Sequence, residues 1–201
     1  MNKILLLIRP ENTEEENNYY IRAIERFGGK VVFVFDLESE QEILSKLDGV
    51  AGILLPGGLG VGLGDFFLIE YALKHDLKLL GVCQGMQSMA LYKTTNKLVS
   101  IGNFKHQQKE GYVHEVNLLP GRLKDIFANN KIMVNSHHLQ TVLSGGKFFV
   151  TGRSSDGLIE AIEGCSKTFQ IGVQWHPERM LDYDMGSNSL FLTFIQNKNT
   201  D

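Results

Sequence analysis

The sequence predicts an α/β protein in which a doubly wound, mostly parallel central sheet is flanked by helices. Three apolar segments, at 3–8, 31–35 and 50–55, lack the polar alternation that a half-exposed strand would have. Helix-favouring segments separate them, and a fourth apolar segment ends at Cys83 and passes directly into helix-favouring residues. Strands that alternate with helices are typical of a parallel sheet, whose ligands bind beyond the carboxyl ends of the strands.

The predicted helices have recognisable starts or ends. The first follows Thr13 with three glutamates in its opening turn, which favour a helix amino terminus, and Gly28-Gly29 ends it. A further helix is expected from about Asp65 to Lys74, before the fourth strand. The closing helix is expected from Ser187 to Gln196, with a polar tail after it.

The second half of the chain contains shorter β-like stretches separated by turn clusters such as Ser144-Gly145-Gly146. We expect these stretches to be antiparallel additions to the same domain. Because no linker, internal repeat or low-complexity block is present, residues 1–201 are expected to form a single domain. The stretches lie at 111–118, 147–152, 158–163 and 169–174.

The composition is that of an ordinary soluble globular protein, since 43% of the 201 residues are hydrophobic and 21% are charged. The 20 basic and 23 acidic residues form no long block, so nothing indicates non-specific nucleic-acid or membrane binding. The apolar start is too short for a signal-peptide core or a membrane span. Two cysteines, Cys83 and Cys165, cannot form a disulfide framework, so we expect a cytoplasmic protein in which Cys165 is a free thiol.

Cys83 lies on a predicted sharp turn from strand to helix, which is the arrangement of a nucleophile elbow. Gly81 and Gly85 flank it where the neighbouring backbone must come close. The helix that follows directs its positive end at the sulfur and so favours the thiolate. The alternative is a small buried cysteine packed beneath a helix.

His176 and Glu178 supply the base that a cysteine nucleophile needs. A strand ends at His176, Pro177 turns the backbone, and the Glu178 carboxylate can bond the far nitrogen of the imidazole. His176 lies 93 positions (176 − 83) after Cys83 in the sequence, so only folding can bring the two residues together. The alternative for His176 is a turn histidine with its hydrogen bonds satisfied.

The glycine-rich segment 56–64 lacks the ending of a phosphate-binding P-loop and the glycine spacing of a dinucleotide site. Its functional interpretation is an oxyanion hole, in which the N–H groups of Gly58 and Gln84 meet a developing tetrahedral oxygen. The alternative is a plain flexible loop.

Four ordered motifs resemble those of class I glutamine amidotransferases, and more narrowly the branch that contains the γ-glutamyl-γ-aminobutyrate hydrolases. They are Leu55–Gly58, Gly81–Gln87, Val134–Gln140 and Gly172–Glu178, and the resemblance covers roughly residues 30–195. It implies a flavodoxin-like sheet and, because it spans nearly the whole chain, favours a stand-alone hydrolase over a fused synthetase.

By this resemblance Cys83 is the nucleophile, His176 the general acid and base, and Glu178 its orienting carboxylate. The implied reaction is hydrolysis of a γ-glutamyl amide through a cysteine thioester, with no cofactor and no metal. Substrate binding is assigned to Gln87 and to the segment formed by Asn135, Ser136, His137 and His138.

The leaving group is less well defined by the sequence. The specific substrate we expect is γ-glutamyl-CDP-amidate, used in capsule biosynthesis, and Arg9 at the sheet edge is the candidate to meet its phosphates. A solvated surface arginine is the alternative for Arg9. Weaker candidates of the same kind are Lys105, His106 and Arg179, whereas His75 and His114 are expected at the surface.

Two other functions remain open at this stage. The chain could be a γ-glutamyl-γ-aminobutyrate-type hydrolase, or a glutaminase subunit that supplies ammonia to a separate synthetase chain. A homodimer is compatible with either. A non-catalytic binding module is disfavoured because Cys83 and His176 are both present.

Overall fold

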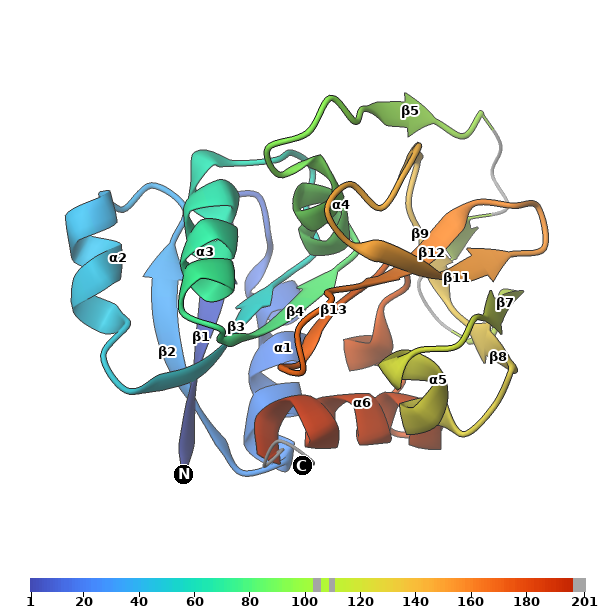
Figure 1. The fold of residues 1–201 in the computed structure, drawn as a ribbon. Coiled ribbons are helices and arrows are strands. Elements are labelled where there is room, and N and C mark those ends of the chain that lie inside the picture. The colour runs from blue at the N-terminus through green and yellow to red at the C-terminus, as the bar shows by residue number, and fades with distance from the viewer. Residues whose placement is uncertain (103–105, 109–110, 197–201) are drawn as a thin grey trace.

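The computed structural model describes residues 1–102, 106–108 and 111–196. Over these residues, nine strands form one sheet in the order β2-β1-β3-β4-β13-β12-β11-β7-β8 (Figure 1). Two small ladders accompany it, one of β5 with β10 and one of β6 with β9. The strands are β1 (Asn2–Ile8), β2 (Gly29–Phe35), β3 (Val50–Leu55), β4 (Lys78–Val82), β5 (Leu98–Ser100), β6 (Gln107–Gln108), β7 (His114–Leu118), β8 (Lys131–Val134), β9 (Ser136–His137), β10 (Gln140–Val142), β11 (Phe149–Ser154), β12 (Ile159–Glu163) and β13 (Gln170–Val173).

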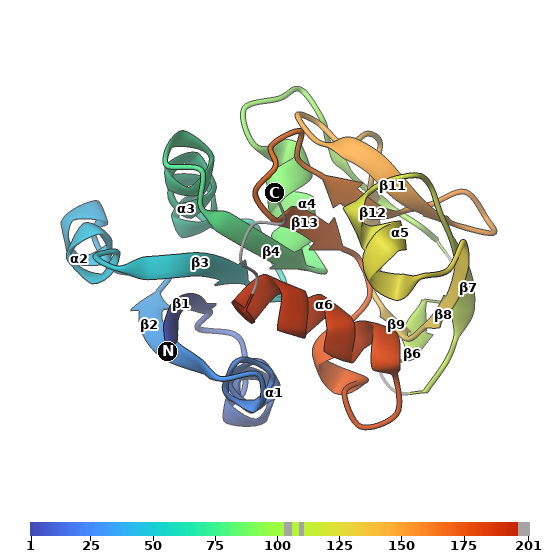
Figure 2. The ribbon, with the colours of Figure 1, turned by 60° about the horizontal axis from the view of Figure 1, so that its bottom comes forward.

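Helices cover both faces of the sheet. They are α1 (Glu14–Arg26), α2 (Glu40–Lys46), α3 (Leu63–Lys74), α4 (Gln84–Leu91), α5 (Arg122–Phe127) and α6 (Met185–Gln196), with the short 3₁₀ helix η1 (Pro177–Arg179). Figure 2 shows α1 and α6 on one side of the parallel strands and α3 and α4 on the other. No helix in the described ranges is both long and apolar enough to cross a membrane.

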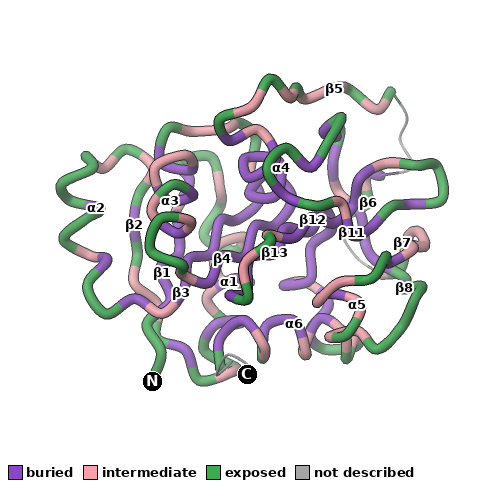
Figure 3. The backbone as a smooth tube through the Cα atoms, viewed as in Figure 1, coloured by how far each residue is buried: buried purple, intermediate pink, exposed green. Residues whose placement is uncertain are grey.

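The parallel half of the sheet follows from strands that are apolar on both faces. Along β1, Ile4 and Leu6 pack into the hydrophobic cluster that contains residues of α1 and α6. Their neighbours Leu5 and Leu7 pack into the cluster that contains residues of α2, α3 and α4, because side chains alternate along a strand. Figure 3 shows these central strands buried, as the continuous apolar segments predict.

The start of α1 is fixed by a capping box. The Thr13 hydroxyl accepts the Glu16 N–H at 3.2 Å, and the Glu16 carboxylate accepts the Thr13 N–H at 3.1 Å. The predicted acidic first turn is confirmed. Ser39 and Glu42 form the same box at the start of α2, which lies where a helix was expected between the second and third strands.

One predicted strand direction is only partly right. The stretch at 169–174, expected as an antiparallel addition, pairs in antiparallel fashion with β12 but runs parallel to β4, with Val173 opposite Val82. The other predicted stretches correspond to β7, β11 and β12, which pair in antiparallel fashion. Strand β8 and helix α5 were not predicted.

Candidate active site

Cys83 lies at the sharp turn between β4 and α4, in a strained backbone conformation with φ 50° and ψ −105°. The flanking glycines are required by close backbone approach. A Cβ at Gly85 would lie 2.2 Å from the Leu55 carbonyl oxygen, and one at Gly81 would lie 2.7 Å from the Gly85 carbonyl carbon. A larger residue at either position would displace the turn, so the predicted elbow geometry is present.

His176 follows β13, and its ring is oriented by Glu178. The imidazole Nδ1 lies 2.7 Å from Glu178 Oε1, and both residues are buried. Asn135 holds the backbone of His176 from both sides, because its Oδ1 accepts the His176 N–H at 2.8 Å and its Nδ2 donates to the His176 carbonyl at 2.9 Å. The ring therefore has a fixed direction.

The charge state of His176 depends on its surroundings. Burial lowers its pKa, but the negative charges of Glu178 and Cys83 outweigh burial and raise the pKa of His176 from 6.5 to about 10. The imidazole is therefore cationic at neutral pH and forms an ion pair with Glu178. Such a ring can deliver a proton to a leaving group.

The sheet brings Cys83 and His176 to the same place. Strands β4 and β13 are parallel neighbours, so both residues leave the sheet at its carboxyl edge. A single Cβ added at Gly57 would lie 2.9 Å from His176 Cε1 and 3.5 Å from Cys83 Cβ. His176 Nε2 has no hydrogen-bond partner among the described residues, which leaves it available to the reacting atoms.

Two backbone amides of the glycine-rich loop donate to side chains outside the loop. Gly57 N–H donates to the Tyr20 hydroxyl at 3.0 Å, and Gly60 N–H donates to Gln84 Oε1 at 2.9 Å. No acceptor among the described residues takes the N–H of Gly58 or of Gln84. Their availability fits the predicted oxyanion-hole role, which stays a prediction.

These residues open into a cavity of about 640 Å³ at the carboxyl edge of the parallel strands. Gln87 lies in its wall and donates to the Gln140 carbonyl and to Gln174 Oε1, both at 3.0 Å. Among the residues that line the cavity are Glu11, Glu16, Tyr20, Gly57, Gly58, Cys83, Gln84, Gln87, His137, His138, His176, Glu178 and Arg179.

The predicted substrate-binding segment is divided between two environments. His137 and His138 border the cavity, whereas Asn135 and Ser136 do not. The Asn135 side chain is occupied by the His176 backbone, and Ser136 Oγ lies 3.0 Å from His106 Nδ1. The side chains of Asn135 and Ser136 therefore position their neighbours, and the role of this segment in substrate binding stays a prediction.

Arg9 does not reach the cavity. Its guanidinium is 1% exposed and makes two hydrogen bonds to the Asp65 carboxylate, at 2.7 and 2.8 Å. The same side chain also donates to the Pro56 carbonyl at 3.2 and 3.3 Å. With its donors directed to internal partners, Arg9 braces the glycine-rich loop, and the prediction that it binds phosphate is wrong.

The weaker candidates have different outcomes. Lys105 lies outside the described residues. Arg179 borders the cavity, with its guanidinium 4.4 Å from the centroid of the Tyr19 ring. His106 is buried away from the cavity, and His114, expected at the surface, has a side chain only 13% exposed and contacts Glu160. Cys165 is an exposed free thiol, as predicted.

Two residues that the sequence analysis missed contact the reacting groups. Gln174 Nε2 donates to Cys83 Sγ at 3.5 Å, and the buried Tyr20 hydroxyl holds Gly57. Burial, followed by the charge of Glu178, raises the pKa of Tyr20 well above its ordinary value, so the phenol stays protonated. Gln174 lies two residues before His176 and could have been identified from that position, whereas nothing near Tyr20 in sequence indicates a site.

The comparisons with known proteins agree with this fold. The family model described as Peptidase C26 matches residues 63–178. A Schizosaccharomyces pombe protein that carries the name glutamine amidotransferase is 32% identical over 205 residues, covering 88% of this chain and 79% of the relative. A CTP synthase of Gloeothece citriformis is 30% identical over 197 residues, and this chain covers 35% of its length.

Solved structures show the same architecture. The glutaminase domain of Trypanosoma brucei CTPS with bound acivicin superposes with a TM-score of 0.77 at 17% identity, covering 97% of this chain and 92% of that domain. The predicted fold class, an α/β sheet of the class I glutamine amidotransferase type, is confirmed.

Proposed function

Because this chain belongs to the Peptidase C26 family, we propose that it hydrolyses the γ-glutamyl amide bond of a small metabolite and releases L-glutamate. The observation that carries the proposal is the meeting of Cys83 and His176 in one cavity, with Glu178 bonded to the far ring nitrogen. A strained cysteine, a cationic imidazole and free backbone amides together form the parts that acyl transfer requires.

In the proposed reaction, the Cys83 thiolate attacks the γ-carbonyl carbon, a C–S bond forms, and the carbonyl electrons move to oxygen. The N–H groups of Gly58 and Gln84 bind that oxyanion. The C–N bond then breaks as His176 Nε2 gives its proton to the leaving nitrogen. Water next attacks the thioester while Nε2 takes one of its protons, and breaking the C–S bond releases glutamate and regenerates the thiolate.

The wall of the cavity supports recognition of the glutamyl part. Gln87 and the backbone around Ser136–His138 are proposed to hold the α-amino and α-carboxylate groups. The cavity of about 640 Å³ lies within the range of about 300–1,000 Å³ that is typical of pockets for drug-sized ligands, so a leaving group larger than ammonia can be accommodated.

The specific substrate we propose is γ-glutamyl-CDP-amidate, which would give CDP-amidate for capsule phosphoramidate modification. Since Arg9 is paired internally, the phosphate contact falls to Arg179, the one Arg or Lys among the described residues lining the cavity. Glu11 and Glu16 also line the cavity and would repel a diphosphate. Binding of this substrate therefore requires that its phosphates approach the cavity along Arg179.

The test is release of glutamate by the purified full chain from a panel of γ-glutamyl amides. The panel contains glutamine, γ-glutamyl-γ-aminobutyrate and γ-glutamyl-CDP-amidate. We expect turnover that requires Cys83 and a highest kcat/KM for the nucleotide amide. Absence of glutamate release across the panel would refute the hydrolase, and a preference for γ-glutamyl-γ-aminobutyrate would refute only the proposed leaving group.

A second candidate function is a glutaminase subunit that supplies ammonia to a separate synthetase chain. The similarity to CTP synthase favours it, because this chain corresponds to about a third of that relative. In that case glutamine hydrolysis would be slow for the chain alone and would rise when a synthetase chain co-purifies and is added back. Full activity without any partner would exclude this alternative.

A further inference from the structure

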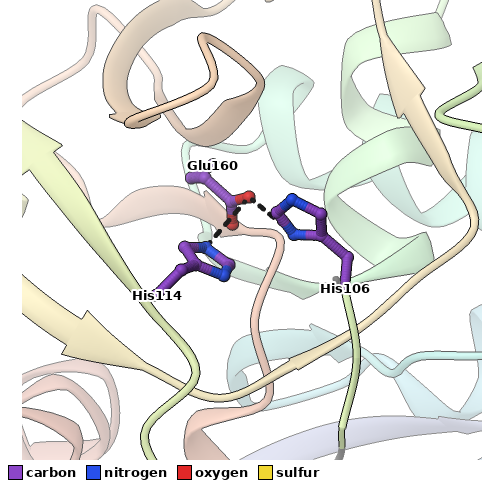
Figure 4. A group of neighbouring side chains, drawn as sticks. All are labelled: His106, His114 and Glu160. Carbon is purple, nitrogen blue, oxygen red and sulfur yellow. Dashed lines mark ion pairs between the residues drawn. The ribbon is translucent and has the colours of Figure 1, made fainter. Parts of the chain in front are cut away.

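Four side chains behind the cavity wall converge on one point; all are buried except His114, whose side chain is 13% exposed, and His138 also borders the cavity. They are His106 before β6, His114 at the start of β7, His138 after β9 and Glu160 in β12; we call them the His/Glu cluster. Figure 4 shows the Glu160 carboxylate between the rings of His106 and His114, which enter from separate segments. Neither the cysteine chemistry nor the proposed substrate contacts require Glu160, which is fully buried.

The spacing of the polar atoms suits a small cation. From Glu160 Oε1, the distance is 3.3 Å to His114 Nε2. It is 3.6 Å to His138 Nε2 and 4.0 Å to His106 Nδ1. A tetrahedral zinc ion with ligands at about 2.0–2.1 Å places its ligand atoms about 3.3 Å apart. The ligand atoms of His106, His114 and Glu160 lie within 4.8 Å of one another, so small side-chain movements would close the site around an ion.

The hydrogen bonds of the cluster are incomplete without a cation. Both carboxylate oxygens of Glu160, both ring nitrogens of His114 and Nε2 of His138 lack hydrogen-bond partners among the described residues. The Glu160 side chain is fully buried, and His114 Nε2 lies 3.3 Å from it without completing a hydrogen bond. A cation held between the rings and the carboxylate would stabilise this buried group.

The tautomer of His138 strengthens this argument. Its Nδ1 lies 3.0 Å from the Gln140 carbonyl, which can only accept, so Nδ1 carries the hydrogen. Nε2, 3.6 Å from Glu160 Oε1, is then the ring atom of His138 that would coordinate an ion shared with the carboxylate.

His106 is oriented in the way that metal-binding histidines commonly are. Its Nε2 lies 3.1 Å from Asp156 Oδ2, and the carboxylate accepts the ring N–H. This leaves Nδ1 with a lone pair that faces Glu160 and is 3.0 Å from Ser136 Oγ. The Ser136 hydroxyl donates to Nδ1 and would turn away when Nδ1 binds a metal. A carboxylate that accepts from the outer nitrogen is the usual second partner of a metal-bound imidazole.

We propose that the His/Glu cluster binds one divalent transition-metal ion of the zinc type as a structural site behind the cavity wall. Three imidazoles with one carboxylate suit zinc, whereas magnesium and calcium prefer oxygen ligands. The ion would tie β7 and β12 to the segment that contains His138. That segment includes His137, whose carbonyl lies 3.9 Å from Cys83 Sγ, so the metal would hold one wall of the cavity in place.

The experiment measures metal content and cobalt binding of the purified full chain, so its outcome is separate from hydrolysis of any substrate. After dialysis against excess zinc and then against metal-free buffer, we expect about one zinc ion per chain. Cys83→Ala should keep that ion, which excludes binding by the thiolate. His114→Gln and Glu160→Gln should lose it, and His75→Gln, which changes an exposed histidine outside the cluster, should retain it.

Cobalt provides a second measurement. Added to metal-free Cys83→Ala protein, cobalt should give the visible absorption of a tetrahedral nitrogen and oxygen site, and His114→Gln should abolish the absorption. Zinc should raise the thermal midpoint of the wild type and of His75→Gln but not of His114→Gln. If Glu160→Gln does not fold, His138→Gln replaces it in the comparison. Wild-type protein without stoichiometric metal, or full retention by His114→Gln, would overturn the proposal.

Discussion

Replacing Glu178 with glutamine tests the proposed role of His176 most directly. Glutamine keeps the shape of the side chain but removes a negative charge 2.7 Å from the ring. The pKa of His176, raised to about 10, exceeds its ordinary value of 6.5 by an amount equivalent to roughly 5 kcal/mol of preference for the charged ring. Without the carboxylate, we expect that pKa to fall and kcat/KM to drop about 10²–10⁴-fold.

The assay is glutamate release followed from about pH 6 to about pH 11. In the wild type, activity should decline as the pH rises through about 10, where His176 loses its proton. In Glu178→Gln the decline should move toward neutral pH. Glu15→Gln removes an exposed carboxylate from α1 and should leave the profile unchanged. An alkaline limb that stays in place in Glu178→Gln would refute the assigned ion pair.

The same shift in pKa has a consequence for stability. A ring whose pKa is raised on folding stabilises the folded state fully below its unfolded pKa of about 6.5. This stabilisation is lost as the pH rises through about 10. The free energy of unfolding, measured with denaturant, should therefore fall between about pH 6.5 and about pH 10, and it should fall less in Glu178→Gln than in the wild type. Equal declines in the two proteins would contradict the assignment.

Further substitutions at Cys83, Arg9, Gln174 and Gln87 have defined outcomes. Cys83→Ala should fold but abolish turnover. Cys83→Gly should also be inactive, yet more stable than Cys83→Ala by about 1–2 kcal/mol in denaturant unfolding, because residue 83 has a φ of 50°, which glycine adopts with less strain. Arg9→Ala should lower the unfolding free energy by about 3–5 kcal/mol, because it leaves Asp65 buried and unpaired. The preference between phosphate-bearing and plain γ-glutamyl substrates should stay unchanged. A rise in KM for the phosphate-bearing substrates alone would show that Arg9 binds phosphate. Gln174→Ala should lower kcat about tenfold, because it removes a hydrogen bond of roughly 1.5 kcal/mol to Cys83. Gln87→Ala should affect KM more than kcat. Equal kcat values for Gln174→Ala and the wild type would exclude the contact between Gln174 and Cys83.

The elbow at Cys83 was predictable because it is local. An apolar strand, two glycines and a helix start are all visible within a few residues of the cysteine. The direction of β13 was not predictable in that way, since the residues of a short, mostly apolar strand do not indicate which strands pair with it or in which direction. It lies between β4, which runs parallel to it, and β12, which runs antiparallel, so it forms the boundary between the two halves of the sheet.

The partner of a buried side chain is a second feature that the sequence did not reveal, as Arg9 shows. Its position at the carboxyl edge followed correctly from the end of β1, but the direction of its side chain depends on Asp65, 56 positions away. The buried pair forms only when folding brings the start of α3 to the residue that follows β1. For α2, in contrast, the signal was present, because Ser39 and Glu42 have the spacing of a capping box.

The segment from Asn135 to His138 explains why its motif could not be assigned a single role. In extended backbone, alternate side chains point in opposite directions. Asn135 and His137 face the proposed active site, where one holds the His176 backbone and the other borders the cavity. Ser136 and His138 lie on the side of the His/Glu cluster, where Ser136 contacts His106 and His138 faces Glu160, and the edge of His138 also borders the cavity. A shift of one residue would exchange the two sets, so contacts on both faces fix the register of the cavity wall.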